Sequence, residues 1–282
     1  MLINNIKNPS HKNLKMINSI YYIILLLLVV MPIASCGKGK APKPDVSEIE
    51  KCDSLPEGVK KLVRIVADND SSGFAAMVSY PLSRPYPLHD IENQEQMKVY
   101  YSVMVDDSLR NAIAGSHPED WDEYGWRGWS LKGGGYVWID DSLYDVSYLS
   151  ARERVMLDSL TAKDMESVES GLRQGWTPVM CLKGNENGAV YRIDMSRTEK
   201  GAPHYRMLVY DKDTDLRSVP TIVYEGHKET EGTAGTSTYY FTDADGHRAV
   251  FVADIPDGSM PKIEFTDTII PVVRAYWLDL TK

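Results

Sequence analysis

The stretch that decides the fold is residues 125–148, GWRGWSLKGGGYVWIDDSLYDVSY. It alternates short runs of aromatic and β-branched residues with turn residues, first at 132–135 and then at 140–142. Such runs, bounded by glycine and aspartate, are typical of strands joined by tight turns. The stretch therefore predicts an antiparallel meander with strands at 125–131, 136–139 and 143–148.

Amphipathic helices are predicted on both sides of this meander. Apolar residues recur at helical spacing along 54–68 and 93–104, and shorter helices are predicted at 72–79 and after Asp106. After the meander, Ser150 and Glu153 form a capping box that predicts the start of another helix. The segment 80–90 contains three prolines, so it is predicted to be extended.

From Trp176 onward the pattern is that of strands. The hairpin signals Asn187-Gly188 and Asp245-Gly246 separate runs of alternating apolar and polar residues. Strands are predicted at 180–183, 189–194, 204–210, 220–224, 237–242, 247–255, 261–266 and 271–279.

The first 35 residues differ from the rest of the chain. Three lysines precede an apolar run from Ile20 to Met31, and small residues follow it. This order is typical of a secretory signal, and the run is shorter than the roughly 20 residues of a membrane-spanning helix. We predict a signal peptide over 1–35.

The residues Ile33-Ala34-Ser35-Cys36 resemble the lipobox of bacterial lipoproteins. The resemblance implies that Cys36 is acylated, becomes the first residue after cleavage and holds the protein on a membrane through its lipid. Residues 36–53 are polar and rich in glycine and proline, which predicts a flexible tether. Gly37, in place of aspartate, indicates the outer membrane, with the protein facing the periplasm. An ordinary signal peptide with a chance cysteine is the alternative.

Charge and cysteine content limit the partners and the compartment. The chain has 31 basic and 40 acidic residues, a net charge of −9, which argues against nucleic acid as a partner. Outside the lipobox there are two cysteines, Cys52 and Cys181. An oxidising compartment permits a disulfide between them, and two unpaired buried thiols are the alternative.

Packing residues between 74 and 153 resemble those of uncharacterised envelope proteins with a nuclear transport factor 2-like (cystatin-like, SnoaL-like) domain. The residues that carry the resemblance are Phe74, Tyr80-Pro81-Leu82, Tyr100-Tyr101, Gly125, Gly128, Trp138-Ile139 and Glu153. The resemblance implies helices packed into the concave face of a curved antiparallel sheet, with a cone-shaped pocket. We therefore expect an α+β domain at 54–170 and a smaller all-β antiparallel domain at 176–282.

Aromatic residues are the candidate binding residues, since the chain has six tryptophans and seventeen tyrosines. The candidate pocket residues are Tyr80, Tyr101, Trp126, Trp129 and Trp138. Aromatic rings at a pocket mouth suit a sugar, a peptide or a lipid, and ordinary core packing is the alternative.

No catalytic residue, cofactor or metal site is predicted. His227, Glu229 and Glu231 alternate as metal ligands on a strand would, but neighbouring glycines favour a loop. The segment Asp211–Asp215 lacks the glycine and glutamate of a calcium loop and is predicted to be an acidic turn.

These observations predict a lipid-anchored protein of the cell envelope that acts as a non-catalytic binding or accessory module. Its partner would be a small molecule, a glycan or a protein. One alternative is a hydrolase or isomerase that uses His89 or His117 with a carboxylate inside the cone. Another is an inhibitor or immunity lipoprotein whose acidic loop around Trp121, residues 119–123, contacts a basic partner.

Overall fold

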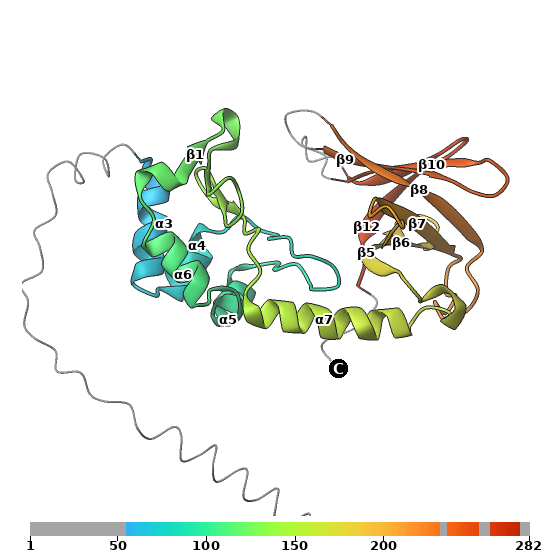
Figure 1. Cartoon of the computed structure of the whole chain (residues 1–282), viewed down its shortest axis with the longest axis horizontal. Coiled ribbons are helices and arrows are strands. Elements are labelled where there is room, and N and C mark those ends of the chain that lie inside the picture. Colours follow the sequence, from blue (N-terminus) through green and yellow to red (C-terminus); the bar gives the residue numbers. More distant parts are fainter. Residues whose placement is uncertain (1–54, 232–235, 254–259, 277–282) are drawn as a thin grey trace, which may run out of the picture. The chain divides into compact units, whose positions relative to one another are not determined.

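The computed structural model describes residues 55–231, 236–253 and 260–276, all within one structural unit, Ser47–Lys282 (Figure 1). The first part of this unit is mainly helical. Its helices are α3 (Glu57–Ala67), α4 (Ser71–Met77), α5 (Gln94–Met104), α6 (Asp107–Ala114) and α7 (Ala151–Glu166). The signal peptide, Cys36 and the tether lie outside the described residues.

Short polar side chains cap the start of four of the five helices. Asp70, Asn93 and Asp106 each accept a hydrogen bond from a backbone N–H in the first turn of α4, α5 and α6. The predicted capping box of Ser150 and Glu153 at the start of α7 is confirmed. These caps satisfy N–H groups that have no partner inside the helix.

A four-stranded antiparallel sheet follows α6 in the order β1-β2-β3-β4. Its strands are β1 (Trp121–Glu123), β2 (Trp129–Leu131), β3 (Trp138–Ile139) and β4 (Leu143–Asp145). The meander is therefore present, but its strands are shorter than predicted. In particular, Gly125–Arg127 forms a 3-10 turn where a strand was expected.

The helices and the sheet share one apolar core. Side chains from α3 to α6 pack against residues of the sheet, among them Trp121, Leu131, Ile139 and Leu143. The predicted stripe of α3 is buried at Val59, Leu62 and Val66. Burial of an aliphatic side chain contributes about 1.5–3 kcal/mol, so this core is the main stabilising feature of the helical part.

The predicted fold class is wrong. The described residues do not form helices packed on a strongly curved sheet followed by an all-β domain; they form helices, a small four-stranded sheet and a closed eight-stranded barrel. The reason lies in 125–148, where glycines and aspartates recur every few residues and limit each strand to two or three residues. A cone-shaped sheet needs long bent strands, which this spacing of turn residues does not permit.

The second part of the unit is a closed antiparallel barrel (Figure 1). Its strands are β5 (Thr177–Gly184), β6 (Val190–Arg197), β7 (Pro203–Tyr210), β8 (Ile222–Glu231), β9 (Thr236–Thr242), β10 (Arg248–Ala253), β11 (Lys262–Phe265) and β12 (Ile269–Arg274). Each strand pairs with the next along the chain, and β12 pairs with β5 at Val272 and Gly184. Closure leaves no unpaired strand edge.

Apolar side chains fill the interior of the barrel. Register places Tyr191 opposite Val209, Tyr239 opposite Phe251 and Phe241 opposite Ala249, and all of these are buried in one cluster. An eight-stranded barrel is just wide enough for side chains to fill. The barrel interior is thus a packed core.

The outer face of β5, β6 and β7 is also buried. Cys181, Val190, Leu208 and Tyr210 form a second apolar cluster there with Tyr86 and residues near the end of α7. Strand residues alternate between faces, so burial on both faces explains why residues 190–194 are all buried. The helices of the described residues are all too short or too polar to cross a lipid bilayer.

Candidate functional site

Aromatic side chains gather at the exposed end of the small sheet. Trp126, in the 3-10 turn, is 71% exposed, and the guanidinium of Arg127 lies 5.5 Å from its ring centre and 6.0 Å from that of Trp138. Trp138 in turn lies 4.9 Å from Tyr124, and the Tyr144 hydroxyl donates to the backbone carbonyl of Arg127 at 2.7 Å. We call these five residues the aromatic surface.

Two glycines make this arrangement possible. Gly128 has a φ of +73°, and a Cβ there would lie 2.4 Å from the carbonyl oxygen of Ile139. Gly134 has a φ of +82°, and a Cβ there would lie 2.6 Å from the indole of Trp138. Only glycine combines these left-handed conformations with such close approaches. The turn that carries Trp126 is therefore held against β3 by backbone contacts.

The five predicted pocket residues do not play a common role. Tyr80 packs on the helical core and donates to the carbonyl of Ala75 at 2.8 Å, and Trp129 packs on the same core. Tyr101 is buried against Phe74 and lines a separate cavity. Trp126 and Trp138 belong to the aromatic surface. The expectation that Trp126 and Trp129 sit on one strand fails because Trp126 lies in a turn.

Cys181 is buried on the outer face of β5 and forms no disulfide within the described part of the chain, and burial raises the pKa of its thiol to about 12. A thiol with a raised pKa stays protonated and is a poor nucleophile. Cys52 lies outside the described residues, so the disulfide between the two cysteines stays a prediction.

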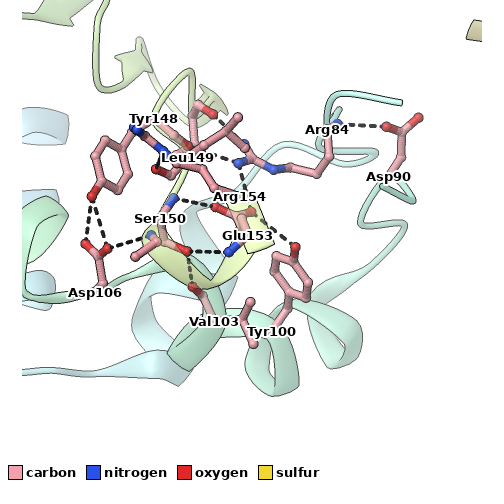
Figure 2. A network of polar contacts seen from close by, with 12 residues as sticks. Arg84, Asp90, Tyr100, Val103, Asp106, Tyr148, Leu149, Ser150, Glu153 and Arg154 are labelled. Carbon is pink, nitrogen blue, oxygen red and sulfur yellow. Dashed lines mark hydrogen bonds and ion pairs between the residues drawn. The ribbon is translucent and has the colours of Figure 1, made fainter. Parts of the chain in front are cut away.

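A buried ion pair joins the proline-rich segment to the start of α7 (Figure 2). The guanidinium of Arg84 lies 2.8 Å from the Glu153 carboxylate, and both side chains are almost fully buried. Arg84 also donates to the carbonyls of Val146 and Tyr148, while Glu153 accepts from Tyr100 at 3.2 Å and from the backbone N–H of Ser150 at 3.0 Å. These hydrogen bonds compensate the cost of burying the two charges, which indicates a structural role.

Asp106 is a second point of contact between elements (Figure 2). Its carboxylate accepts from the backbone N–H groups of Leu109 and Ala151 and from the Tyr148 hydroxyl at 3.0–3.2 Å. Partial burial by itself would raise the pKa of Asp106, but these hydrogen bonds outweigh it and hold the pKa below its ordinary value of 3.8.

This pKa shift makes the stability of the helical part depend on pH. A carboxylate with a depressed folded-state pKa stabilises the fold above its ordinary pKa, and the contribution is lost as pH falls through the folded-state pKa. We expect Asp106→Asn to cost about 1 kcal/mol near neutral pH. The difference from the wild type should shrink at pH values below about 4. Urea unfolding at several pH values measures this difference, and a difference that does not change with pH would contradict the assignment.

Four charged side chains form a second buried network on the outer face of the barrel. Arg192 of β6 lies 2.6 Å from Asp164 of α7 and 2.7 Å from Asp194, and Asp194 also pairs with Arg206 of β7 at 2.8 Å. Tyr86 donates to Asp164 at 2.6 Å. The two aspartates balance the two arginines, so the cluster is neutral.

The histidines of the described residues do not form a closed catalytic pair. His89 stacks on Tyr276 at the surface, and His117 is exposed. Three imidazole–carboxylate pairs are present, at His204–Glu225, His227–Glu229 and His247–Asp243, all on barrel strands or their turns and none in an enclosed cavity. A proton transfer site sheltered from water is therefore not found among these residues.

Two of the residues considered as metal ligands lie in a different element from the one predicted. His227 and Glu229 lie on strand β8 and not in a loop, with 3.1 Å between the ring nitrogen and the carboxylate. Asp243, Asp245 and His247, in the turn between β9 and β10, offer ligand atoms within 4.8 Å of one another. Asp243 already accepts three hydrogen bonds within that turn, and it raises the pKa of His247.

The acidic segment around Trp121 is partly engaged within the chain. Trp121 is buried and donates to Ser116 at 3.0 Å. Asp120 accepts from the backbone of His117 at 2.9 Å, and Asp122 accepts from that of Gly133 at 3.0 Å. Two of the four carboxylates thus stabilise turns, which weakens the case for a docking patch.

Comparison of the chain with protein-family models, with curated proteins and with solved structures found no match. Any role must therefore be argued from the residues themselves. Sequence reasoning named Trp126 and Trp138 but missed Arg127, Tyr124 and Tyr144. The sequence signal that could have indicated these residues is the alternation of aromatic residues with Arg127 and glycines at 124–128.

Proposed function

We propose that this chain is a lipid-anchored protein of the bacterial cell envelope, held on the outer membrane by acylated Cys36 and facing the periplasm. The support is the basic and apolar leader followed by Ile33-Ala34-Ser35-Cys36. Acyl chains contribute about 0.8 kcal/mol for each buried CH₂, so two or more hold a protein firmly.

We further propose that its folded part is a non-catalytic binding module that uses the aromatic surface. The observation that carries this proposal is the exposure of Trp126, a large apolar ring left 71% in solvent beside Arg127. Tryptophan, tyrosine and arginine are the residues that most often dominate binding energy. A ring held on a rigid turn loses little conformational freedom on binding.

A glycan is the ligand that this surface fits best. The indole ring of Trp126 offers an open apolar face for the C–H groups of a sugar ring. Beside it, Arg127 offers a donor for hydroxyl groups, and the exposed Asp140, which lies next to Gly128, offers an acceptor. The surface spans one turn and two short strands, β3 and β4, which suits a few sugar units better than a broad protein interface.

Trp126→Ala is expected to weaken glycan binding about 30-fold or more, because loss of a central aromatic anchor typically costs at least about 2 kcal/mol. The thermal unfolding midpoint should stay unchanged, since the ring is mostly exposed. Affinity electrophoresis of the full chain through purified envelope polysaccharides and binding to peptidoglycan sacculi measure the loss.

The matched control is Val99→Ala, which removes another exposed apolar side chain, 81% exposed on α5. It should bind like the wild type. Equal binding by Trp126→Ala would contradict the glycan assignment. A protein crosslinked specifically through a photoreactive residue at position 126 would contradict it as well.

A further inference from the structure

Arg127 is the cation of the aromatic surface, and it is half-buried there. Its guanidinium packs against two indole rings, those of Trp126 at 5.5 Å and Trp138 at 6.0 Å from the ring centres. Its backbone is fixed as well, because the Arg127 carbonyl accepts from the Tyr144 hydroxyl at 2.7 Å and its N–H donates to the Tyr124 carbonyl at 3.2 Å. The positive charge is therefore held at a defined place beside the exposed ring of Trp126.

Within the described part of the chain, the guanidinium of Arg127 makes ring contacts but no hydrogen bond to a protein oxygen and no ion pair with a carboxylate. Arg274, which is also half-buried, shows the usual arrangement, since it donates to Asp90 at 2.7 Å and to the Arg84 carbonyl at 2.6 Å. A partly desolvated donor without an acceptor is unfavourable. The donors of Arg127 are accessible beside Trp126, so an acceptor on a bound molecule is able to reach them.

Two carboxylates lie near this surface, but neither forms an ion pair with Arg127. Asp140 is exposed, and Asp145 accepts a hydrogen bond from Ser147. Burial raises the pKa of Tyr144, Arg127 lowers it, and the two carboxylates raise it further, so all three charges lie around this hydroxyl. Water and salt screen the repulsion between exposed Asp140 and a bound anion more strongly than they screen a direct contact with the half-buried guanidinium.

We infer that the glycan bound at the aromatic surface is acidic, and that Arg127 pairs with a carboxylate on it. This assignment rests on the glycan binding proposed above and names the class of glycan. A guanidinium donates two parallel N–H···O bonds to a planar carboxylate, and such charge-assisted bonds are roughly twice as strong as neutral ones. In a uronic acid the carboxylate is attached directly to the sugar ring. A ring that stacks on Trp126 therefore places the carboxylate near the neighbouring guanidinium.

Calorimetric titration of the full chain in detergent with purified envelope polysaccharides tests this assignment. Each polysaccharide is used as isolated and again after carbodiimide and borohydride have converted its carboxylates to alcohols, which keeps the backbone and removes the charge. We expect the wild type to bind the acidic form about tenfold more tightly than the reduced form, because a charge-assisted pair replaces a neutral hydrogen bond. The ratio of the two dissociation constants is the quantity to compare between variants.

Arg127→Gln removes the charge and should bring this ratio to about one. Arg127→Lys keeps the charge but not the planar pair of donors, so its ratio should lie between those of Arg127→Gln and the wild type. The matched control is Lys132→Gln, which removes an exposed cation that lies 5.8 Å from the Tyr136 ring in the turn between β2 and β3. Its ratio should equal that of the wild type. A variant that merely unfolds would lose both forms together, which the ratio distinguishes from loss of the charge contact.

The outcomes separate this assignment from glycan binding itself. If the wild type binds neither form of any polysaccharide, glycan binding fails and the acidic class fails with it. If the wild type binds both forms equally, or if Arg127→Gln keeps the wild-type ratio, the acidic class is overturned while glycan binding stands. In that case Trp126→Ala should still weaken binding of both forms, because the ring contact does not depend on the charge.

Discussion

Asp194→Ala is expected to destabilise the barrel by about 3–5 kcal/mol, enough to unfold a domain of ordinary stability. Asp194 is fully buried and pairs with both Arg192 and Arg206. Removal of its charge leaves two buried arginines with only Asp164 as a counter-charge. Desolvated charge without a partner is among the most costly defects in a protein interior. Urea unfolding followed by circular dichroism measures the loss.

Two further variants separate charge from packing. Glu186→Ala removes an exposed carboxylate in the turn between β5 and β6 and should change stability by less than about 0.5 kcal/mol. The double variant Asp194→Ala with Arg206→Ala restores charge balance, leaving Arg192 with Asp164. It should therefore cost clearly less than the sum of the two single changes. A loss within about 1 kcal/mol for Asp194→Ala would show that the network is not coupled as its geometry indicates.

Cys36→Ala is expected to abolish incorporation of fatty acid into the protein completely. Acylation takes place on the cysteine sulfur, and alanine offers no acceptor. Metabolic labelling with an alkyne fatty acid, followed by a fluorescent tag, measures it. The protein should also lose its firm association with the membrane fraction, because an apolar run shorter than about 20 residues does not span a bilayer stably.

The control for this experiment is Cys52→Ala, which removes a nearby cysteine outside the lipobox. It should be labelled and fractionate like the wild type. Fatty acid on the Cys36→Ala protein would refute the lipoprotein proposal. Mass spectrometry of the wild type that finds an unmodified Met1 would refute it too.

Local elements were largely predictable from sequence. Except for β8, the strands of the barrel lie close to the predicted ranges, because alternation and turn signals such as Asn187-Gly188 act over short distances. The caps at Asn93 and Ser150 were predictable for the same reason. Local signals failed in the segment 226–235. Its glycines suggested a loop, but β8 continues through this segment as far as Glu231.

Closure of the barrel was not predictable in this way. It depends on β12 pairing with β5, strands nearly ninety residues apart, and no local signal records such a pairing. The aromatic surface depends likewise on Gly128 and Gly134 bringing a turn against β3. The predicted cone failed because a resemblance in packing residues does not fix the length of strands.

The sequence by itself determined which segments form the helices and the barrel strands, the acidic charge and the leader pattern, since each depends on neighbours along the chain. The tertiary structure alone decided which charges pair and which strands are buried on both faces. Arg84 pairs with Glu153, and Arg192 pairs with Asp164, only because elements far apart in the sequence pack together. The physical reason is that side-chain alternation places a residue on one face of its element, while what covers that face is set by the packing of the whole chain.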